Sequence, residues 1–267
     1  MHDRERAFVI LNLLRQQPVV YVSQIVEATG ASAASVRRDI TKLVEAGQAR
    51  RVHGGLEAPG SAGAQAEPLA TRAFDVSQTL HGEAKRAIAQ AAVAMCADGE
   101  AIIINGGTTT FQMADFLRER RLKILTNSYP LAERLIHESQ NRVALPGGEV
   151  YRDQKLIVSP FDDDAIQHYS ASLMFMSAMS IGPLGVIEGD PLIARAEAKL
   201  LRRAEKLVVL ADSSKFARRG SLVVCPLSRV DTLITDDAAP AEALDMLRAA
   251  GVKIMQVSLR AQASSAA

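Results

Sequence analysis

Residues 101–105 (AIIIN) have the length and apolar character of a buried strand, and G-G-T-T-T follows them directly. Glycines leave backbone N–H groups accessible, and a helix that begins in such a loop adds further donors and the positive end of its dipole. Threonine hydroxyls add side-chain donors, so this segment is suited to binding a phosphate. The candidate residues are Asn105, Gly106, Gly107, Thr108, Thr109 and Thr110. Thr109 and Thr110 can equally be N-caps of the helix, and both interpretations stay open.

Further polar residues or glycines follow three other strand-like runs, at Asn127 and Ser128, at Gly147 and Gly148, and at Asp212 and Lys215. Ligands of open parallel sheets bind beyond the carboxyl ends of the strands, so we expect these loops to converge with the first on one crevice. Lys215 can meet an anionic oxygen, and Asp212 can accept sugar hydroxyls. For both residues, a strand-end salt bridge or a helix cap is the alternative.

Glu197 and Lys199 lie on the predicted helix that precedes the strand ending at Asp212. Residues two apart on a helix face different directions, so at most one of them is expected to point into the site, and Glu197 is our candidate. The histidines show no metal-ligand spacing, and Cys96 and Cys225 form no CxxC pair. The sequence therefore predicts no metal site, no cofactor and no disulfide framework.

A different chemistry is indicated near the N-terminus, where basic residues are concentrated in residues 36–53. Polar residues there recur at helical spacing on the face opposite an apolar stripe, namely Ser35, Arg38, Asp39 and Lys42. Such a face can enter the major groove of DNA, with Ser35, Arg37 and Arg38 at base edges and Lys42 on phosphate. The full set of candidate DNA-binding residues is Ser23, Ser32, Ser35, Arg37, Arg38, Lys42, Arg50, Arg51, His53 and Gly54. A solvated basic face is the alternative.

Three helices and a small wing must position these residues. An apolar stripe predicts a first helix that ends before Pro18 and contains Ala7, Ile10, Leu11 and Leu14. We expect a second helix with N-cap Ser23 that stops at Gly30, and a third that is capped by Ser32 and ends at Gly47. The third helix buries Val36, Ile40, Leu43 and Val44. Residues 48–56 form two short runs around a diglycine turn, which predicts a wing whose Arg50, Arg51 and His53 lie along the phosphate backbone.

The remainder of the chain alternates between strand-like and helix-like patterns. Seven apolar runs have strand length, at residues 101–105, 123–127, 143–146, 173–176, 207–212, 232–235 and 253–257. Helical stretches separate several of them, at residues 111–120, 131–138, 193–204 and 241–250. This order predicts an α/β fold with a mainly parallel sheet. The uncharged stretch 169–187 is long enough to span a bilayer, but serines and glycines interrupt it, so we interpret it as a buried strand followed by a loop.

Charge is divided unevenly along this chain of 267 residues and net charge +1. Residues 1–58 hold eight Lys/Arg and six Asp/Glu, whereas the remaining residues hold 23 and 24, so the positive excess is N-terminal. The run 58–68 consists mainly of small residues, with Glu67 as its single charged residue, and it predicts a linker, with a long surface loop as the alternative. We therefore predict a DNA-binding domain at residues 1–57, a linker at 58–73, a ligand-binding domain at 74–260 and a tail at 261–267. The cysteine usage and the charged N-terminus favour a cytoplasmic protein.

Residues 32–55, SAASVRRDITKLVEAGQARRVHGG, resemble the winged helix-turn-helix signature of the DeoR family of bacterial transcriptional repressors. The arginine pair, Asp39, Leu43, Gly47 and HGG match the family's spacing, although Leu56-Glu57 follows where many members carry alanine. HGEAKRAIA, IIINGGTTTF, ILTNSYPLA and LVVLADSSKF are similar to the sensor domain of the same family. INGGTTTF, TNSYPLAERLI and LIVSP are most similar to the family's L-ascorbate-utilisation branch.

The resemblance implies a sensor domain related to ribose-5-phosphate isomerase and glucosamine-6-phosphate deaminase, with a phosphorylated sugar as effector. Two positions depart from the pattern. Asn105 stands where many relatives have Asp, and Arg195 precedes Glu197 where many have a further Glu. Arg195 favours an extra anionic group, which is consistent with a phosphorylated sugar acid or lactone.

The expected function is that of a repressor of a sugar or sugar-acid catabolic operon, controlled by a phosphorylated sugar or sugar-acid effector. Its expected partners are double-stranded operator DNA, this effector and further copies of the chain in a homodimer or homotetramer, with no membrane. An active isomerase or deaminase that uses Asp212, Glu197 and Lys199 is the alternative from another class. An architectural DNA-binding protein without a ligand is a third.

Overall fold

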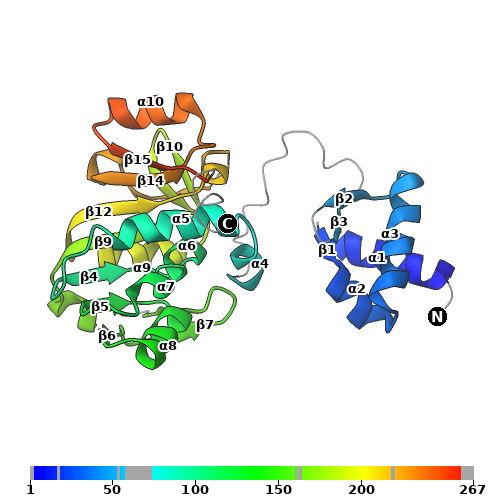
Figure 1. The fold of residues 1–267 in the computed structure, drawn as a ribbon, viewed down its shortest axis with the longest axis horizontal. Helices are drawn as coiled ribbons and strands as arrows, with labels where there is room; N and C mark the ends of the chain where they lie inside the picture. Colours follow the sequence, from blue (N-terminus) through cyan, green and yellow to red (C-terminus); the bar gives the residue numbers. More distant parts are fainter. Residues whose placement is uncertain are drawn as a thin grey trace, which may run out of the picture. The chain divides into compact units, whose positions relative to one another are not determined.

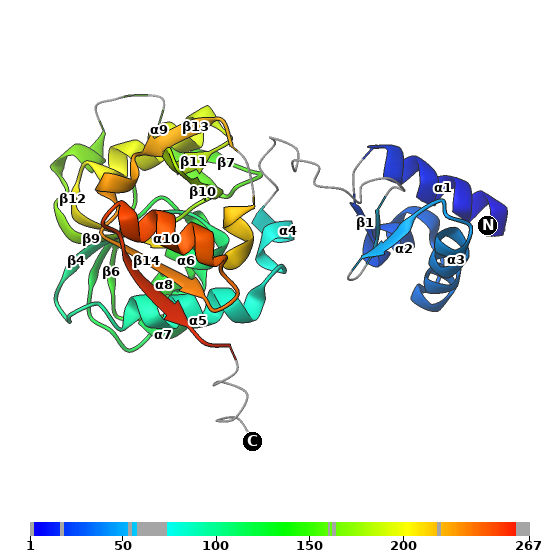
Figure 2. The same ribbon diagram turned by 90° about the horizontal axis from the view of Figure 1, so that it is seen from above.

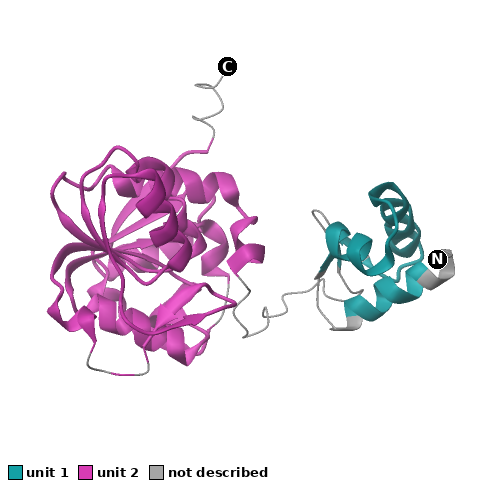
Figure 3. Cartoon of the chain, turned by 90° about the horizontal axis from the view of Figure 1, so that it is seen from below, with its two compact units in different colours: residues 1–65 teal, residues 66–267 magenta. Residues whose placement is uncertain are grey.

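The computed structural model describes residues 3–16, 19–52, 55–57, 74–159, 161, 164–217 and 220–259. The chain forms two compact units, residues 1–65 and residues 66–267 (Figure 3). The predicted tail, and all of the predicted linker at 58–73, lie outside the described residues. The domain boundaries at residues 57 and 73 stay predictions.

The first unit contains three helices and a three-stranded antiparallel sheet. The helices are α1 (Asp3–Gln16), α2 (Val22–Thr29) and α3 (Ala33–Glu45). The strands β1 (Val19–Tyr21), β2 (Arg50–Val52) and β3 (Gly55–Glu57) pair in the order β1-β3-β2. The core confirms the predicted stripes and contains Ile10, Leu14, Val20, Ile25, Val36, Ile40, Leu43, Ala49 and Leu56. The strand β1 was not expected from the sequence.

The ends of these helices test the predicted caps. Ser32 Oγ accepts the amide of Ser35, which confirms Ser32 as the N-cap of α3. Gly30 has a φ of +65° and ends α2 as predicted. The prediction that Ser23 caps α2 is wrong, because β1 leads directly into the helix and Tyr21 occupies the N-cap. There, the amide of Tyr21 donates to Oε1 of Gln24 at 2.9 Å.

The second unit is built around a seven-stranded parallel sheet (Figures 1 and 2). Its strands are β4 (Ala101–Ile104), β5 (Lys123–Thr126), β6 (Arg142–Ala144), β9 (Ala171–Ser177), β12 (Ala204–Leu210), β14 (Thr232–Asp236) and β15 (Lys253–Val257). Their order is β15-β14-β12-β9-β4-β5-β6. Each of the seven predicted runs is one of these strands, so the predicted fold class is confirmed.

Helices cover both faces of this sheet. One face packs against α5 (Gly82–Val93), α7 (Ala114–Leu117) and α8 (Tyr129–Glu138) through one apolar cluster. The other packs against α9 (Pro191–Leu201) and α10 (Ala241–Ala249) through a second cluster. The single helix expected at residues 111–120 is instead two short ones, α6 (Thr108–Phe111) and α7. The amides of Gln112 and Met113 donate to carbonyls three residues earlier, and this tighter turn divides the helix.

Smaller elements complete the second unit. A hairpin of β7 (Glu149–Tyr151) and β8 (Leu156–Val158) lies beside the sheet, and β10 (Ser180–Gly182), β11 (Gly185–Glu188) and β13 (Leu222–Cys225) form a separate antiparallel sheet. The helix α4 (Phe74–Gln78) opens the unit, and 3-10 turns occur at η1 (Ala165–His168), η2 (Ser213–Phe216) and η3 (Leu227–Arg229). The stretch 169–187 is therefore a buried strand followed by a hairpin. No helix among the described residues is long and apolar enough to cross a bilayer.

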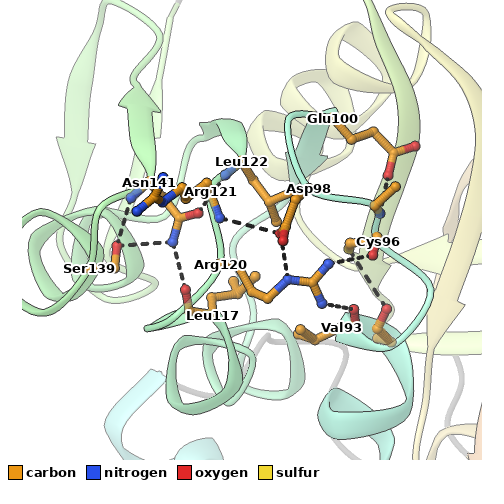
Figure 4. Close-up of polar contacts among 12 residues, drawn as sticks. Val93, Cys96, Asp98, Glu100, Leu117, Arg120, Arg121, Leu122, Ser139 and Asn141 are labelled. Carbon is orange, nitrogen blue, oxygen red and sulfur yellow. Dashed lines mark hydrogen bonds and ion pairs between the residues drawn. The ribbon is translucent and has the colours of Figure 1, made fainter.

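The amino-terminal edge of the sheet is held together by polar contacts around Arg120 and Asn141 (Figure 4). Arg120 donates to Asp98 Oδ1 at 2.8 Å and to the carbonyl of Cys96 at 2.6 Å. The side chain of Asn141 accepts the amide of Leu122 and donates to the carbonyl of Leu117, both at 2.8 Å. These contacts connect α5, α7 and the starts of β5 and β6.

Candidate functional site

The strand order reverses between β4 and β9, since β5 and β6 follow on one side of β4 while β9, β12 and β14 follow on the other. In open parallel sheets, this switch point is where ligands bind beyond the carboxyl ends of the strands. Residues 105–110 follow β4, residues 127–128 follow β5 and residues 212–215 follow β12. We call these three segments the ligand loops.

Asn105 joins the two strands at the switch point to α9. The amide of Ser177, at the end of β9, donates to Asn105 Oδ1 at 2.9 Å. Asn105 Nδ2 donates in turn to Glu197 Oε1 at 2.7 Å and to the carbonyl of Ser177 at 3.3 Å. Both Asn105 and Glu197 are buried. Many relatives have Asp at this position, and an aspartate here would place a second carboxylate against Glu197. The amide of Asn105 instead donates a hydrogen bond to Glu197.

The electrostatics of Glu197 follow from this burial. Removal from water raises the pKa of Glu197 well above its ordinary value, the nearby Glu188 raises it further, and the hydrogen bond from Asn105 opposes both. Glu188 is itself buried, and its Oε1 accepts the amide of Gly189 at 2.7 Å. A carboxyl group with a raised pKa can remain protonated and donate a hydrogen bond to a ligand oxygen.

The second ligand loop contacts the first. Asn127 Oδ1 accepts the amide of Gly106 at 2.8 Å, whereas the buried Asn127 Nδ2 has no hydrogen-bond partner within the described chain. Ser128 is buried and caps α8, its Oγ accepting the amide of Leu131 at 3.4 Å. Buried polar groups are normally paired, so the free donor on Asn127 indicates a place for an acceptor such as a ligand oxygen or water.

The first ligand loop approaches β9 closely. A Cβ atom on Gly107 would lie 2.5 Å from the Cβ of Ser177, so only glycine fits at this position. The amide of Thr110 donates to Ser177 Oγ at 3.1 Å, and Thr110 Oγ1 donates to the carbonyl of Gly107 at 3.1 Å. Thr108 and Thr109 are also buried, and the N-cap of α6 is Gly107 without a side-chain cap. The structure therefore does not support the N-cap interpretation of these threonines.

The third ligand loop brings Asp212 and Lys215 to the same edge. Asp212 Oδ1 accepts the amide of Ser214 at 3.1 Å, which makes Asp212 the N-cap of η2, while its buried Oδ2 has no partner among the described residues. Burial raises the pKa of Asp212, but the hydrogen bond from Ser214 and the electrostatic effects of Lys215, His81 and Lys85 outweigh it and lower the pKa overall. Asp212 is thus an ionised carboxylate with one free acceptor.

Among the remaining candidates, Gly148 and Lys199 contact residues outside the three ligand loops. Gly148, with a φ of +147°, lies against the carbonyl of Val158 in β8, and Gly147 precedes it where the chain leaves β6. Lys199 pairs with Asp164 at 3.1 Å and also donates to the carbonyl of Phe161. Glu197 and Lys199 therefore have different surroundings, as their spacing predicted.

In the first unit, α3 exposes a basic face. Arg37, Arg38 and Lys42 are exposed, and Arg38 Nη2 donates to Ser35 Oγ at 3.3 Å. Ser23, in the first turn of α2, and Ser32 are exposed as well. Arg51 is exposed on β2, whereas the Arg50 side chain and the predicted wing residues His53 and Gly54 lie outside what the structure describes.

Asp39 corrects one detail of the predicted face. The spacing places it beside Ser35, Arg38 and Lys42, but its side chain is buried and pairs with Arg6 of α1. Arg6 Nε donates to Asp39 Oδ2 at 2.7 Å and its Nη2 donates to Oδ1 at 3.3 Å. Because the partner lies 33 residues away, the spacing within α3 gave no indication of this pair.

Three residues of the site were not among the sequence candidates. Ser177 was regarded only as a polar interruption of an apolar stretch, and Glu188 and Lys85 were not considered individually. Lys85 lies within the HGEAK motif, and its side chain is buried on α5. A buried lysine in a motif is the signal that would have singled it out.

Comparison with known proteins supports the assignment of both units. Residues 6–62 match the DeoR-like helix-turn-helix domain, and residues 80–237 match the DeoR C-terminal sensor domain. The chain is 35% identical to the HTH-type transcriptional regulator UlaR of Shigella dysenteriae serotype 1 (strain Sd197) over 257 residues, which are 96% of this chain and 100% of that protein. The identity and coverage are the same for UlaR of Escherichia coli (strain K12 / DH10B).

Solved structures are similar only in part. Ribose 5-phosphate isomerase A from Methanocaldococcus jannaschii is 17% identical, with a TM-score of 0.36 over 49% of this chain and 53% of that chain. The eIF2B beta subunit from Chaetomium thermophilum is 15% identical, with a TM-score of 0.39 over 57% of this chain and 48% of that chain.

Proposed function

Because the chain belongs to the DeoR family of transcriptional regulators, we propose that it represses a sugar or sugar-acid catabolic operon and is controlled by a phosphorylated sugar or sugar acid. The first unit reads double-stranded operator DNA through the exposed basic face of α3 and through β2. The second unit binds the effector. The protein acts in the cytoplasm as a homodimer or homotetramer, because paired heads on paired half-sites bind more tightly than one.

The observation that carries the effector site is the pair of buried, unsatisfied atoms Asn127 Nδ2 and Asp212 Oδ2 at one edge of the sheet. One is a donor and the other an acceptor, as a polyhydroxylated ligand requires. The phosphate is assigned to the loop from Gly106 to Thr110. The backbone amides and hydroxyls of Thr108 and Thr109 are the proposed donors there, since those of Thr110 bond to Ser177 and Gly107. Glu197 and Lys215 complete the set, the first through a hydrogen bond and the second through its charge.

The contacts of Lys199 favour a sensor over an active isomerase. The isomerase considered would use Lys199 together with Asp212 and Glu197, but Lys199 is engaged with Asp164 and with the carbonyl of Phe161. We therefore propose that the second unit binds its sugar phosphate without converting it. Turnover of ribose 5-phosphate or glucosamine 6-phosphate by the purified chain would contradict this.

The proposal is tested in two steps. Thermal unfolding is measured with a panel of ribose 5-phosphate, glucosamine 6-phosphate, 6-phosphogluconate, its lactone and inorganic phosphate, and at least one organic phosphate should raise the transition temperature. An operator is then selected from a randomised DNA library, and its affinity is measured with and without that compound. The effector assignment would be wrong if no compound of the panel stabilised the chain. It would also be wrong if the stabilising compound left the operator affinity unchanged.

A further inference from the structure

The helix α4, residues Phe74–Gln78, is the first described element of the second unit and directly follows the predicted linker in the chain. It has five residues, and Phe74 is its only fully buried side chain. A helix this short gains little stability from its own hydrogen bonds, so the contacts of its side chains decide where it lies. Those contacts come from the surroundings of all three ligand loops.

The first contact joins α4 to the first ligand loop, to which the proposed function assigns the phosphate. Phe111 ends α6, directly after Thr108, Thr109 and Thr110. Its ring meets that of Phe74 edge to face, with centroids 5.6 Å apart and planes at 85°. In Figure 1, α4 lies beside α6, and the two helices are in contact. A shift of α6 that accompanies phosphate binding would therefore move the ring on which Phe74 packs.

The second contact comes through the β7–β8 hairpin, which is attached to the Asn127–Ser128 loop. The amide of Ile157 donates to the carbonyl of Asn127 at 2.8 Å, and the amide of Tyr129 donates to the carbonyl of Lys155 at 3.0 Å. From the same hairpin, Lys155 Nζ pairs with Asp75 at 2.6 Å and lies 5.5 Å from the centre of the Phe74 ring.

The backbone of the hairpin turn strengthens this second connection. The amide of Phe74 donates to the carbonyl of Asp153 at 2.9 Å. Lys155 has a φ of +53°, a left-handed conformation that is costly for a residue with a side chain. The surrounding contacts hold Lys155 in this conformation, which directs its ammonium group to α4.

The third contact involves Lys85, which is buried on α5. Its Nζ donates to the carbonyl of Ser77 in α4 at 2.5 Å. The same charge acts on Asp212 in the third ligand loop, where it is one of the positive charges that stabilise the carboxylate. A ligand group that binds at Asp212 changes the field at Lys85 and with it the strength of the bond to Ser77.

From these contacts we propose that α4 transmits effector occupancy to the linker and to the DNA-binding unit. The proposal rests on the proposed function, because it takes the three ligand loops to be the effector site. Binding at the ligand loops changes the docking of α4 on Phe111 and Lys155, and α4 is the first described element after the predicted linker that joins the two units.

The test compares operator affinity with and without effector in the full chain. The probe is the compound of the panel that stabilises the wild-type chain most, with inorganic phosphate as the fragment that occupies the phosphate loop alone. In the wild type, the probe should change the operator dissociation constant by about tenfold to a hundredfold, the usual range of allosteric coupling. In Phe74→Ala, that factor should fall to about threefold or less, while the probe still raises the unfolding temperature.

Two further variants separate coupling from folding. Lys155→Met removes a half-exposed charge, so folding should be retained while the coupling factor falls. Phe116→Ala is the matched control, since it removes an aromatic ring on α7 that contacts Arg86, and it should keep the wild-type factor. If Phe74→Ala does not fold, Lys155→Met alone decides the question.

Hydrogen exchange provides a local measurement in the wild type. The amides of α4 should exchange at a different rate when the probe is bound, because docking of the helix is coupled to occupancy. Unchanged exchange of α4, or a wild-type coupling factor in both Phe74→Ala and Lys155→Met, would overturn the role of α4 while leaving effector control intact. A wild-type chain that does not respond to any of the probes would instead contradict the proposed function itself.

Discussion

At the residue scale, the site depends on groups whose neighbours differ from those that spacing suggests. Asp39 lies on the polar face of α3 by count, yet it is buried against Arg6. Ser177 lies within an apolar run, yet its amide and hydroxyl hold Asn105 and the loop that contains Thr110. Helical and strand periodicity reports which way a side chain leaves its own element. It carries no information on a partner that another element supplies.

Glu197→Gln should change the pH dependence of stability. The folded-state pKa of Glu197 is raised above its ordinary value of 4.5, so the folded chain retains a proton that the unfolded chain releases. The stability that this group contributes is therefore fully present below pH 4.5 and is lost as the pH rises through the folded-state pKa. Glutamine removes that loss, so the free energy of unfolding of the variant should rise relative to that of the wild type as the pH rises.

Denaturant unfolding of both chains between about pH 5 and pH 8, the range in which a raised carboxyl pKa is expected to act, measures this difference. Glu205→Gln is the control, because Glu205 is exposed on β12 and should show no such trend. A free-energy difference between Glu197→Gln and the wild type that is independent of pH would contradict the assignment.

Arg38→Ala should weaken specific operator binding by about 1–3 kcal/mol and relax the choice of base at one position of each half-site, because Arg38 is expected at a base edge. Effector-induced thermal stabilisation should be unchanged. Lys42→Ala is the comparison, since a phosphate contact weakens binding to all sequences alike. Fluorescence anisotropy on the selected operator and on single-base variants distinguishes the two. If Arg38→Ala lost the same affinity on every DNA sequence, Arg38 would not contact a base edge.

Thr109→Val should have the complementary effect. The substitution keeps the shape of a buried side chain and removes its hydroxyl, so folding and DNA binding should be retained while the stabilisation by the sugar phosphate is lost. Thermal unfolding with and without the phosphate panel measures the loss. If both Arg38→Ala and Thr109→Val lost both activities, the assignment of separate roles to the two units would be wrong.

At the scale of elements, the sequence was informative where strands are buried on both faces. The five inner strands of the parallel sheet, β4, β5, β9, β12 and β14, appear as mainly apolar runs, because helices cover both sides of them, whereas the edge strands β6 and β15 are only partly buried. The strands β1, β7, β8, β10, β11 and β13 have three or four residues each and show no period that a sequence pattern can reveal. The ligand loops were predictable because they follow the buried strands. The contacts of the β7–β8 hairpin with those loops were not.

Asn141→Ala should destabilise the second unit. Its side chain pairs with the amide of Leu122 and the carbonyl of Leu117, and alanine leaves both partly buried backbone groups without a partner. The expected cost is about 1–3 kcal/mol. The adjacent Gln140→Ala is the control, because Gln140 is exposed and its substitution should change the free energy of unfolding by about 0.5 kcal/mol or less. Equal effects of the two substitutions would show that the contacts in Figure 4 contribute little.

At the scale of the whole molecule, a net charge of +1 gives the chain little general attraction to DNA. Affinity must then come from a few phosphate contacts in each head together with base contacts, and from the number of heads that bind at once. The logarithm of the binding constant falls with the logarithm of salt concentration by about 0.9 per phosphate contact. Removal of a single contact from each head therefore reveals how many heads are engaged.

The variant Arg51→Ala is suited to measuring the number of bound heads, because Arg51 is exposed on β2, where a phosphate contact is expected. The salt slope of operator binding should become shallower by about 0.9 if one head is bound and by about 1.8 if two are bound. We expect the larger change, since the proposed dimer or tetramer places two heads on two half-sites. An exposed cation of the second unit, Lys123, provides the control, and Lys123→Ala should leave the slope unchanged. A change in the salt slope of about 0.9 on a palindromic operator would contradict paired binding. An unchanged salt slope would mean that Arg51 does not contact a phosphate.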